Sequence, residues 1–148
     1  SNHSSLIYRR ALKHGMPRAY LRNYNEFLQV GPGWKWVDDL TFKLSDGSKV
    51  FATHGMAADG LKLSMQMGCH TIQGHFHSKA AINYFSNPSQ LVWSLQVGCL
   101  TKQSSLAFQY ARNFKMRFII STGAIINGQP VLYPMQLNDN GRWTGELV

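Results

Sequence analysis

Acidic side chains are scarce in this sequence. Its 148 residues include seven aspartates and glutamates against 15 lysines and arginines, which gives a formal net charge of +8 at pH 7. A net positive charge of this size favours phosphates and nucleic acids as partners. The densest basic group lies in the first third of the chain and comprises Arg9, Arg10, Lys13, Arg18 and Arg22. These side chains fit a phosphate-binding patch and a solvated helix face about equally well.

Cysteines and long apolar runs are also lacking. The two cysteines, Cys69 and Cys99, are far apart and lie among apolar residues, which predicts buried free thiols in a reducing cytosol rather than a disulfide. No apolar run approaches the roughly 20 residues that a membrane-spanning helix needs. The first residues of the chain contain no long apolar stretch of the kind found in signal peptides. We therefore expect a cytoplasmic protein with no membrane partner.

The residues that are abundant indicate a folded chain. Hydrophobic residues make up 44% of the sequence and aromatic residues 12%, so the chain can form a core and is not expected to be disordered. The length corresponds to about one domain, and neither internal repeats nor low-complexity segments occur. Residues 1–148 are therefore predicted to belong to a single domain.

The spacing of apolar residues predicts helices first and strands afterwards. Helical spacing occurs over residues 6–13, 18–29 and 57–67, with Gly68 as the end of the last helix and Met56 to Met67 packed in its core. Strand patterns cover residues 34–44, 49–53, 70–73, 80–85, 91–97, 117–122 and 131–137. Hairpin turns are expected at residues 45–48, 127–128 and 140–141. The expected fold class is α/β, with N-terminal helices followed by a largely antiparallel sheet.

Three histidines lie where strands are expected to end. His54 follows an apolar run, and His75 and His77 follow another, directly after Gly74. In an extended backbone, side chains two residues apart point to the same side, and imidazole is the commonest side-chain metal ligand. The βαβ-like unit over residues 54–75 places His54 and His75 at neighbouring strand ends, where open α/β folds bind ligands. A metal site is therefore predicted, although a lone strand-end histidine such as His54 is more often structural.

These motifs resemble a known family. Asn2-His3, His54-Gly55 and Gly74-His75-Phe76-His77 are similar, in order and rough spacing, to the last three motifs of the calcineurin-like metallophosphoesterases. Further segments resemble phage-encoded members of that family, so the host cytoplasm is the implied location. They are Tyr24-Asn25-Glu26, Gln73-Gly74-His75, Gln96-Val97-Gly98-Cys99-Leu100, Ser105-Leu106-Ala107-Phe108, Ile125-Ile126-Asn127-Gly128 and Gly141-Arg142-Trp143. The resemblance covers essentially the whole chain and implies a partial metallophosphoesterase-like sandwich.

The resemblance also implies a site and an activity. In that family two divalent metal ions, which here would be Mn, Fe, Zn or Ni, clamp a phosphoester and activate a water. By motif position, Asn2, His54 and His75 would hold one metal, and His77 would help to hold the other. His3 would contact the phosphate as a general acid, and Arg9 or Arg10 would add positive charge beside it. The implied activity is that of a phosphatase, or of a phosphodiesterase or nuclease acting on nucleotides or nucleic acid.

Two family motifs are missing from this sequence. Asp-x-His and Gly-Asp-x-x-(Asp), which supply the bridging aspartate and most of the other metal's ligands, do not occur. The chain therefore resembles the C-terminal half of a metallophosphoesterase domain, and a missing N-terminal half is an expected partner. An alternative is a non-catalytic nucleic-acid-binding or protein-interaction module that retains half of a metal site. Asn2 and His3 also fit a terminal segment without function, and His14 and His70 are expected to have no chemical role.

Overall fold

The computed structural model describes residues 2–101 and 117–147, with side chains over 5–101 and 117–146. The chain divides into two compact units, Ser1–Asp38 and Asp39–Val148, which are described separately below. Whether both belong to one domain, as the sequence predicts, stays a prediction. Among the described residues, no helix combines the length and the apolar character needed to cross a membrane.

The first unit contains three short helical segments. They are α1 (Asn2–Lys13), the 3-10 helix η1 (Arg18–Tyr20) and α2 (Tyr24–Leu28). The predicted single helix over residues 18–29 is wrong, because the backbone becomes extended at Leu21 and Asn23. Asn23 starts a new helix there: its side chain accepts a hydrogen bond from the Glu26 amide at 2.9 Å, and the Glu26 carboxylate accepts one from the Asn23 amide at 3.3 Å. This reciprocal capping fixes the start of α2.

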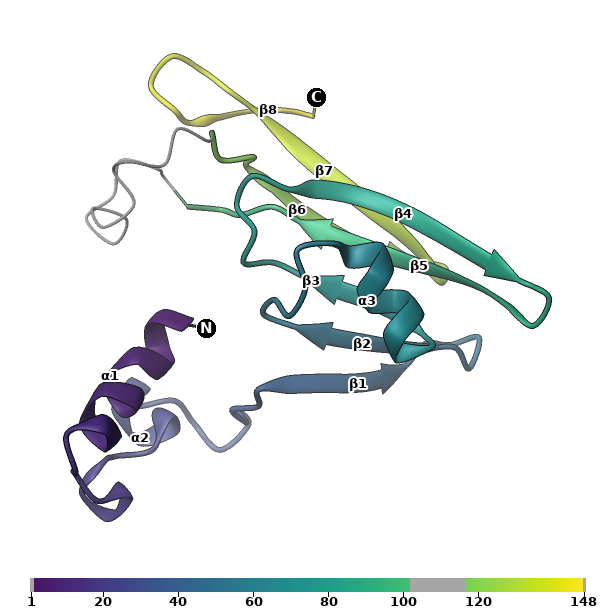
Figure 1. Ribbon diagram of the computed structural model, residues 1–148. Coiled ribbons are helices and arrows are strands. Elements are labelled where there is room, and N and C mark those ends of the chain that lie inside the picture. The colour runs from purple at the N-terminus through teal and green to yellow at the C-terminus, as the bar shows by residue number, and fades with distance from the viewer. Residues whose placement is uncertain (1, 102–116, 148) are drawn as a thin grey trace. The chain divides into compact units, whose positions relative to one another are not determined.

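The second unit contains a mixed sheet and an antiparallel sheet (Figure 1). The mixed sheet has the order β1-β2-β3-β5-β4, and the antiparallel sheet has the order β6-β7-β8. The elements are β1 (Asp39–Lys43), β2 (Lys49–Thr53), α3 (Gly60–Met67), β3 (His70–Gln73), β4 (Ala80–Asn87), β5 (Gln90–Val97), β6 (Ser121–Ile126), β7 (Gln129–Leu137) and β8 (Trp143–Leu147). The α/β class is thereby confirmed, as are all three predicted hairpins. Two predicted strands are too long at their N-terminal ends, since β1 begins at Asp39 and β6 at Ser121.

The predicted βαβ unit is confirmed. β2 pairs with β3 in parallel, with Val50 opposite His70 and Thr53 opposite Gln73, and α3 connects the two strands. Asp59 caps α3 by accepting hydrogen bonds from the amides of Leu61 and Lys62, and Gly68 ends the helix in the left-handed conformation that favours glycine. The C-terminal ends of β2 and β3 therefore lie side by side.

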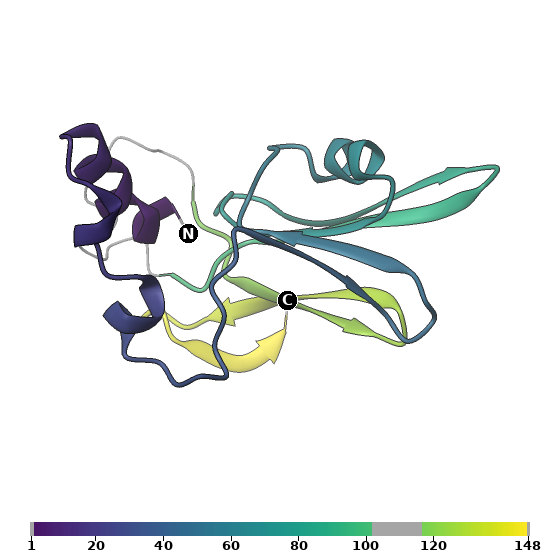
Figure 2. The ribbon, with the colours of Figure 1, turned by 90° about the horizontal axis from the view of Figure 1, so that it is seen from below.

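The mixed sheet is covered on both faces (Figure 2). α3 lies against one face, and β6 and β7 lie against the other. The apolar core is on the β6–β7 side, where Val50, Trp93 and Leu95 are buried and pack against partly buried Ile72, Ile125 and Leu132, among others. The Trp93 indole also donates a hydrogen bond to the Gly128 carbonyl of the β6–β7 hairpin at 3.2 Å. This contact joins the two sheets at one end.

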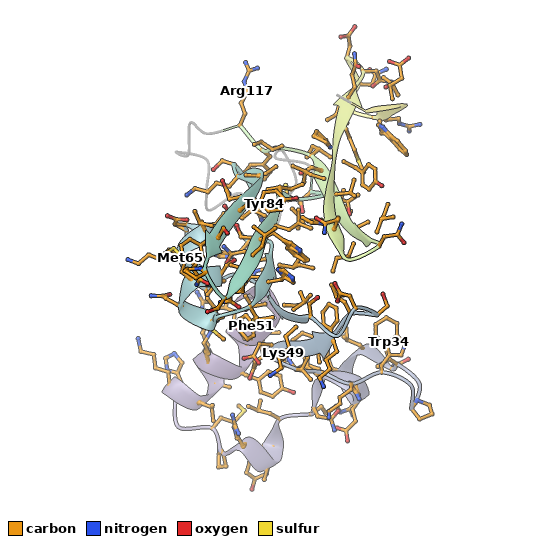
Figure 3. The ribbon with its side chains drawn as sticks, turned by 90° about the vertical axis from the view of Figure 1, so that its right-hand side faces the viewer. Trp34, Lys49, Phe51, Met65, Tyr84 and Arg117 are labelled. Carbon is orange, nitrogen blue, oxygen red and sulfur yellow. The ribbon has the colours of Figure 1, made fainter. Side chains whose placement is uncertain are left out.

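The methionines near α3 do not form a core, contrary to the prediction. Leu63 and Ser64 occupy the buried face of the helix, while Met56, Met65 and Met67 are exposed. Met65 lies on the outer side of the helix, with 51% of its surface exposed (Figure 3). The pattern was misread because the sequence does not show that a serine, rather than a methionine, faces the sheet.

Replacement of Leu95 by alanine tests the position of the core. Leu95 is 1% exposed between the two sheets, so Leu95→Ala should lower the free energy of unfolding by about 2–5 kcal/mol through lost burial and a cavity. Leu91 lies on the same strand and is 57% exposed, so Leu91→Ala should cost less than about 0.5 kcal/mol. Urea denaturation measures both changes, and equal losses would contradict the assigned core.

Candidate metal centre

Two of the predicted metal ligands lie together at one edge of the mixed sheet. His54 follows β2 and His75 follows β3, and the parallel pairing brings both to the same end. His75 Nδ1 lies 3.2 Å from His54 Nε2, and the ring centroids are 5.0 Å apart. The predicted convergence of these strand ends is therefore confirmed. Their binding of a metal stays a prediction.

His75 and His77 are not related as neighbours on an extended strand. β3 ends at Gln73, and the chain then turns, with the Phe76 amide donating to the Gly74 carbonyl at 2.7 Å. His75 has a left-handed backbone (φ 65°), which is uncommon outside glycine and often occurs at functional sites. The His77 ring instead packs edge-on against Phe118 at 4.6 Å. The assumption of an extended backbone over residues 75–77 is therefore wrong.

The side chain of His75 approaches the backbone closely at Gly55, the residue after His54. A Cβ atom at position 55 would overlap the side chain of His75. At Gly74 a Cβ atom would have ordinary contacts, the nearest being the His54 carbonyl oxygen at 3.7 Å. Glycine is thus needed at position 55 to let His75 approach the loop that carries His54. The sequence motif drew attention to Gly74 because it precedes the histidine pair.

The separation of the two ring nitrogens fits a hydrogen bond between the imidazoles, and it also fits two ligands of one metal ion. At a metal–nitrogen distance of about 2.0–2.1 Å, two nitrogens on one ion lie about 2.9 Å apart at a right angle and about 3.4 Å apart at the tetrahedral angle. The observed 3.2 Å lies between these values. Among the side chains that the structure describes, however, no three histidines, cysteines or acidic residues gather into a group that could hold a metal. His54 and His75 therefore fit two ligand positions, and further donors are needed for the others.

The remaining predicted site residues belong to the first unit. Asn2 and His3 open α1, but their side chains lie outside the described part of the chain. Arg9 and Arg10 are on the same helix and are exposed. Their contributions to a metal or phosphate site stay predictions. The segment 105–108, which contributes to the family resemblance, also lies outside the described residues.

A buried glutamine lies beside the histidine pair, and the sequence analysis gave it no role of its own. Gln73 is the last residue of β3 and is 1% exposed. Its side chain hydrogen-bonds to the backbone of Met56 and Ala57, in the loop that begins with His54. No local signal marked it, because Ile72 is the one apolar residue of this four-residue strand.

The other histidine and the cysteines in this unit have packing roles. His70 stacks on Trp93 with ring centroids 4.4 Å apart, and its Nδ1 accepts a hydrogen bond from the Trp93 amide at 3.1 Å. Burial lowers the pKa of His70 and raises the pKa of both thiols, Cys69 and Cys99. Both cysteines are free, as predicted, although they are only partly buried. Raised pKa values keep these thiols protonated near neutral pH, which does not favour nucleophilic or metal-binding roles.

The first unit contains an open groove of about 990 Å³. Among the residues that line it are three basic side chains, Arg9, Arg18 and Lys35, and the acidic side chains of Glu26 and Asp38. Three aromatic rings form a row along it: Tyr8 lies 4.8 Å from Tyr24, which stacks on Trp36 at 3.8 Å. Desolvation, and then the charges of Tyr8 and Asp38, raise the pKa of Tyr24, while Arg9 opposes this shift.

Comparisons of the chain with protein-family models, with curated proteins and with solved structures found no match. The function proposed below therefore depends on the geometry of the chain and on the resemblance of its sequence motifs.

Substitution of the two glycines distinguishes their roles. Gly55→Ala should displace His75 and change the ring signals of both histidines in ¹H–¹⁵N NMR spectra, because the added methyl group overlaps the His75 side chain. Gly74→Ala is the matched control and should leave those signals near their original positions. Unchanged histidine signals in Gly55→Ala would contradict the close approach described here.

Proposed function

We propose that this chain is part of a metal-dependent phosphoester hydrolase of the calcineurin-like type, in which His54 and His75 hold one divalent metal ion. The supporting observation is the 3.2 Å approach of their ring nitrogens at the ends of two parallel strands. This approach depends on a tertiary contact between segments 21 residues apart, not on chance neighbours in sequence. Gly55 makes room for it.

The other roles follow the family resemblance. Asn2 would supply a further oxygen ligand, His77 a ligand to a second metal, and His3 a proton to the leaving oxygen, with Arg9 or Arg10 beside the phosphate. Divalent metals at such a site polarise the phosphoester and lower the pKa of a bound water. Two adjacent divalent ions repel one another, so bridging carboxylates are required. Because the sequence contains neither aspartate motif, we propose that another polypeptide segment supplies these carboxylates.

The substrate is a phosphoester, and the charge of the chain favours a nucleotide or nucleic acid. The net charge of +8 attracts polyanions at long range. A phosphoprotein substrate would also fit the reaction. Mn, Fe, Zn and Ni all accept imidazole and oxygen ligands, so the ligand types leave the metal open.

Metal titration tests the histidine pair. His54→Ala and His75→Ala should each weaken Mn²⁺ binding by at least about tenfold, since even indirect partners of metal ligands are worth about 10–100-fold. His14→Ala, an exposed position in the first unit, is the control and should bind as the unaltered chain does. Hydrolysis of bis(4-nitrophenyl) phosphate is expected only when the segment that supplies the carboxylates is also present, and it should then be lost in His75→Ala and kept in His14→Ala. Equal Mn²⁺ affinity in all four proteins, or no binding by the unaltered chain, would contradict the proposal.

A second candidate function is the binding of single-stranded nucleic acid by the first unit. The observation that favours it is the groove, which is lined by Arg18 and Lys35 and by the rings of Tyr24 and Trp36, which stack on each other. Basic side chains that follow a backbone, together with aromatic rings that stack on bases, are typical of such sites. The two acidic residues of the groove, Glu26 and Asp38, weaken its positive charge. This function is compatible with hydrolysis of a nucleic acid and also with a non-catalytic module.

Salt dependence tests this second function. Affinity for an oligothymidine should fall as the salt concentration rises. Arg18→Ala and Lys35→Ala should each make the slope of log K against log salt shallower by about 1, because each removes about one phosphate contact. Lys13→Ala is the control, because Lys13 is exposed on α1 and does not line the groove. Fluorescence anisotropy measures the binding. A slope that is flat, or equally reduced in all three variants, would exclude the groove as the binding site.

A further inference from the structure

Gln73 connects the two segments that carry the histidine pair. It is the last residue of β3, two positions before His75, and its side chain points to the α3 side of the sheet, where it is buried. There its Oε1 atom accepts a hydrogen bond from the Met56 amide at 3.2 Å and lies 3.5 Å from the Ala57 amide. Its Nε2 atom donates to the Ala57 carbonyl at 2.7 Å. The Gln73 side chain therefore contacts both the amide and the carbonyl of Ala57.

Residues 54–59 form a loop without regular secondary structure between β2 and α3. Two other side chains hold this loop at its next residue: Lys79 Nζ donates to the Ala58 carbonyl at 2.6 Å, and Gln96 Nε2 donates to the same oxygen at 3.4 Å. Gln96 is opposite Gln73 in the β3–β5 pairing, so the two buried amides lie on neighbouring strands. Gln73 makes the shorter contacts and is the more deeply buried of the two.

A buried amide is costly unless its donors and acceptors are satisfied. An apolar residue would fill the space beneath α3 without this cost, but it could not fix the position of an irregular loop. Hydrogen bonds are directional and of limited length, so the Gln73 amide sets where Met56 and Ala57 lie. Because His54 is two residues before Met56, the same contacts limit where His54 can lie.

We propose that Gln73 is a positioning residue for the His54–His75 pair. It holds residues 54–59 against β3, so that His54 Nε2 stays within 3.2 Å of His75 Nδ1. Its importance for metal binding rests on the proposed function, whereas its effect on the two imidazoles does not depend on a metal. The two effects can therefore be tested separately.

The test compares Gln73→Leu with Thr71→Val. Thr71 is on the same face of β3, is 0% exposed and hydrogen-bonds to the Ser64 hydroxyl at 2.7 Å. Both substitutions remove a buried hydrogen bond beneath α3, so both should lower the melting temperature. Of these two residues, Gln73 is the one that hydrogen-bonds to the loop 54–59, so only Gln73→Leu should alter the histidine pair.

The expected result has two readouts. In long-range ¹H–¹⁵N NMR spectra without metal, Gln73→Leu should shift the ring signals of His54 and His75, and Thr71→Val should leave them in place. With Mn²⁺ added, Gln73→Leu should bind at least about tenfold more weakly, in the range seen for indirect partners of metal ligands, and Thr71→Val should bind normally. Gln73→Glu keeps the acceptor but loses the donor when ionised, and should fall between Gln73→Leu and the unaltered chain.

Unaltered histidine signals in Gln73→Leu, or equal shifts in Gln73→Leu and Thr71→Val, would overturn the positioning role. If Gln73→Leu does not fold, Gln73→Glu replaces it, because it removes the donor to the Ala57 carbonyl and keeps the acceptor. It should shift the same signals by a smaller amount, and no shift would overturn the role. Failure of the unaltered chain to bind Mn²⁺ would overturn the proposed function alone, since the spectra without metal still decide whether Gln73 orders the imidazoles.

Discussion

The parallel pairing of β2 with β3 is the constraint on which the candidate site depends. Antiparallel neighbours would place the residues after the two strands at opposite edges of the sheet, and His54 could not meet His75. Parallel neighbours require a crossover connection, and α3 provides it. The loop between β2 and α3 then carries His54, and the turn after β3 carries His75. The histidine pair is thus a product of topology, and Gly55 and Gln73 adjust its local geometry.

The two faces of the mixed sheet are built from different interactions. The face toward β6 and β7 is apolar and contains Trp93 and Leu95. Between this sheet and α3 lie buried polar side chains, namely Ser64, Thr71, Gln73, Ser94 and Gln96. Most of these are satisfied by one another or by the backbone, although Ser94 Oγ has no hydrogen-bond partner in the part of the chain that is described. Apolar packing joins the two sheets, whereas directional hydrogen bonds place the helix and the loop beside the histidines.

The sequence predicted the features that depend on local chemistry. The bounds of β2 and β3 are as predicted, and so are Gly68 at the end of α3 and the three hairpin turns. One local signal was overlooked: Asn23 and Glu26 form a capping box that starts a new helix and breaks the one predicted over residues 18–29. Features that depend on tertiary contacts were also missed. The exposure of Met65 depends on which helix face meets the sheet. The left-handed His75 and the bonding of Gln73 across 16 residues have no local pattern.

The strand order β1-β2-β3-β5-β4 also has a consequence for folding. The β1–β2 and β4–β5 hairpins are pairings of adjacent segments, which close short loops and form fast. β3 has only four residues and must enter between the two hairpins through non-local parallel pairings. We therefore expect it to dock late. The imidazole pair can exist only after that step, so a ligand bound to it would stabilise the completed sheet and neither hairpin alone.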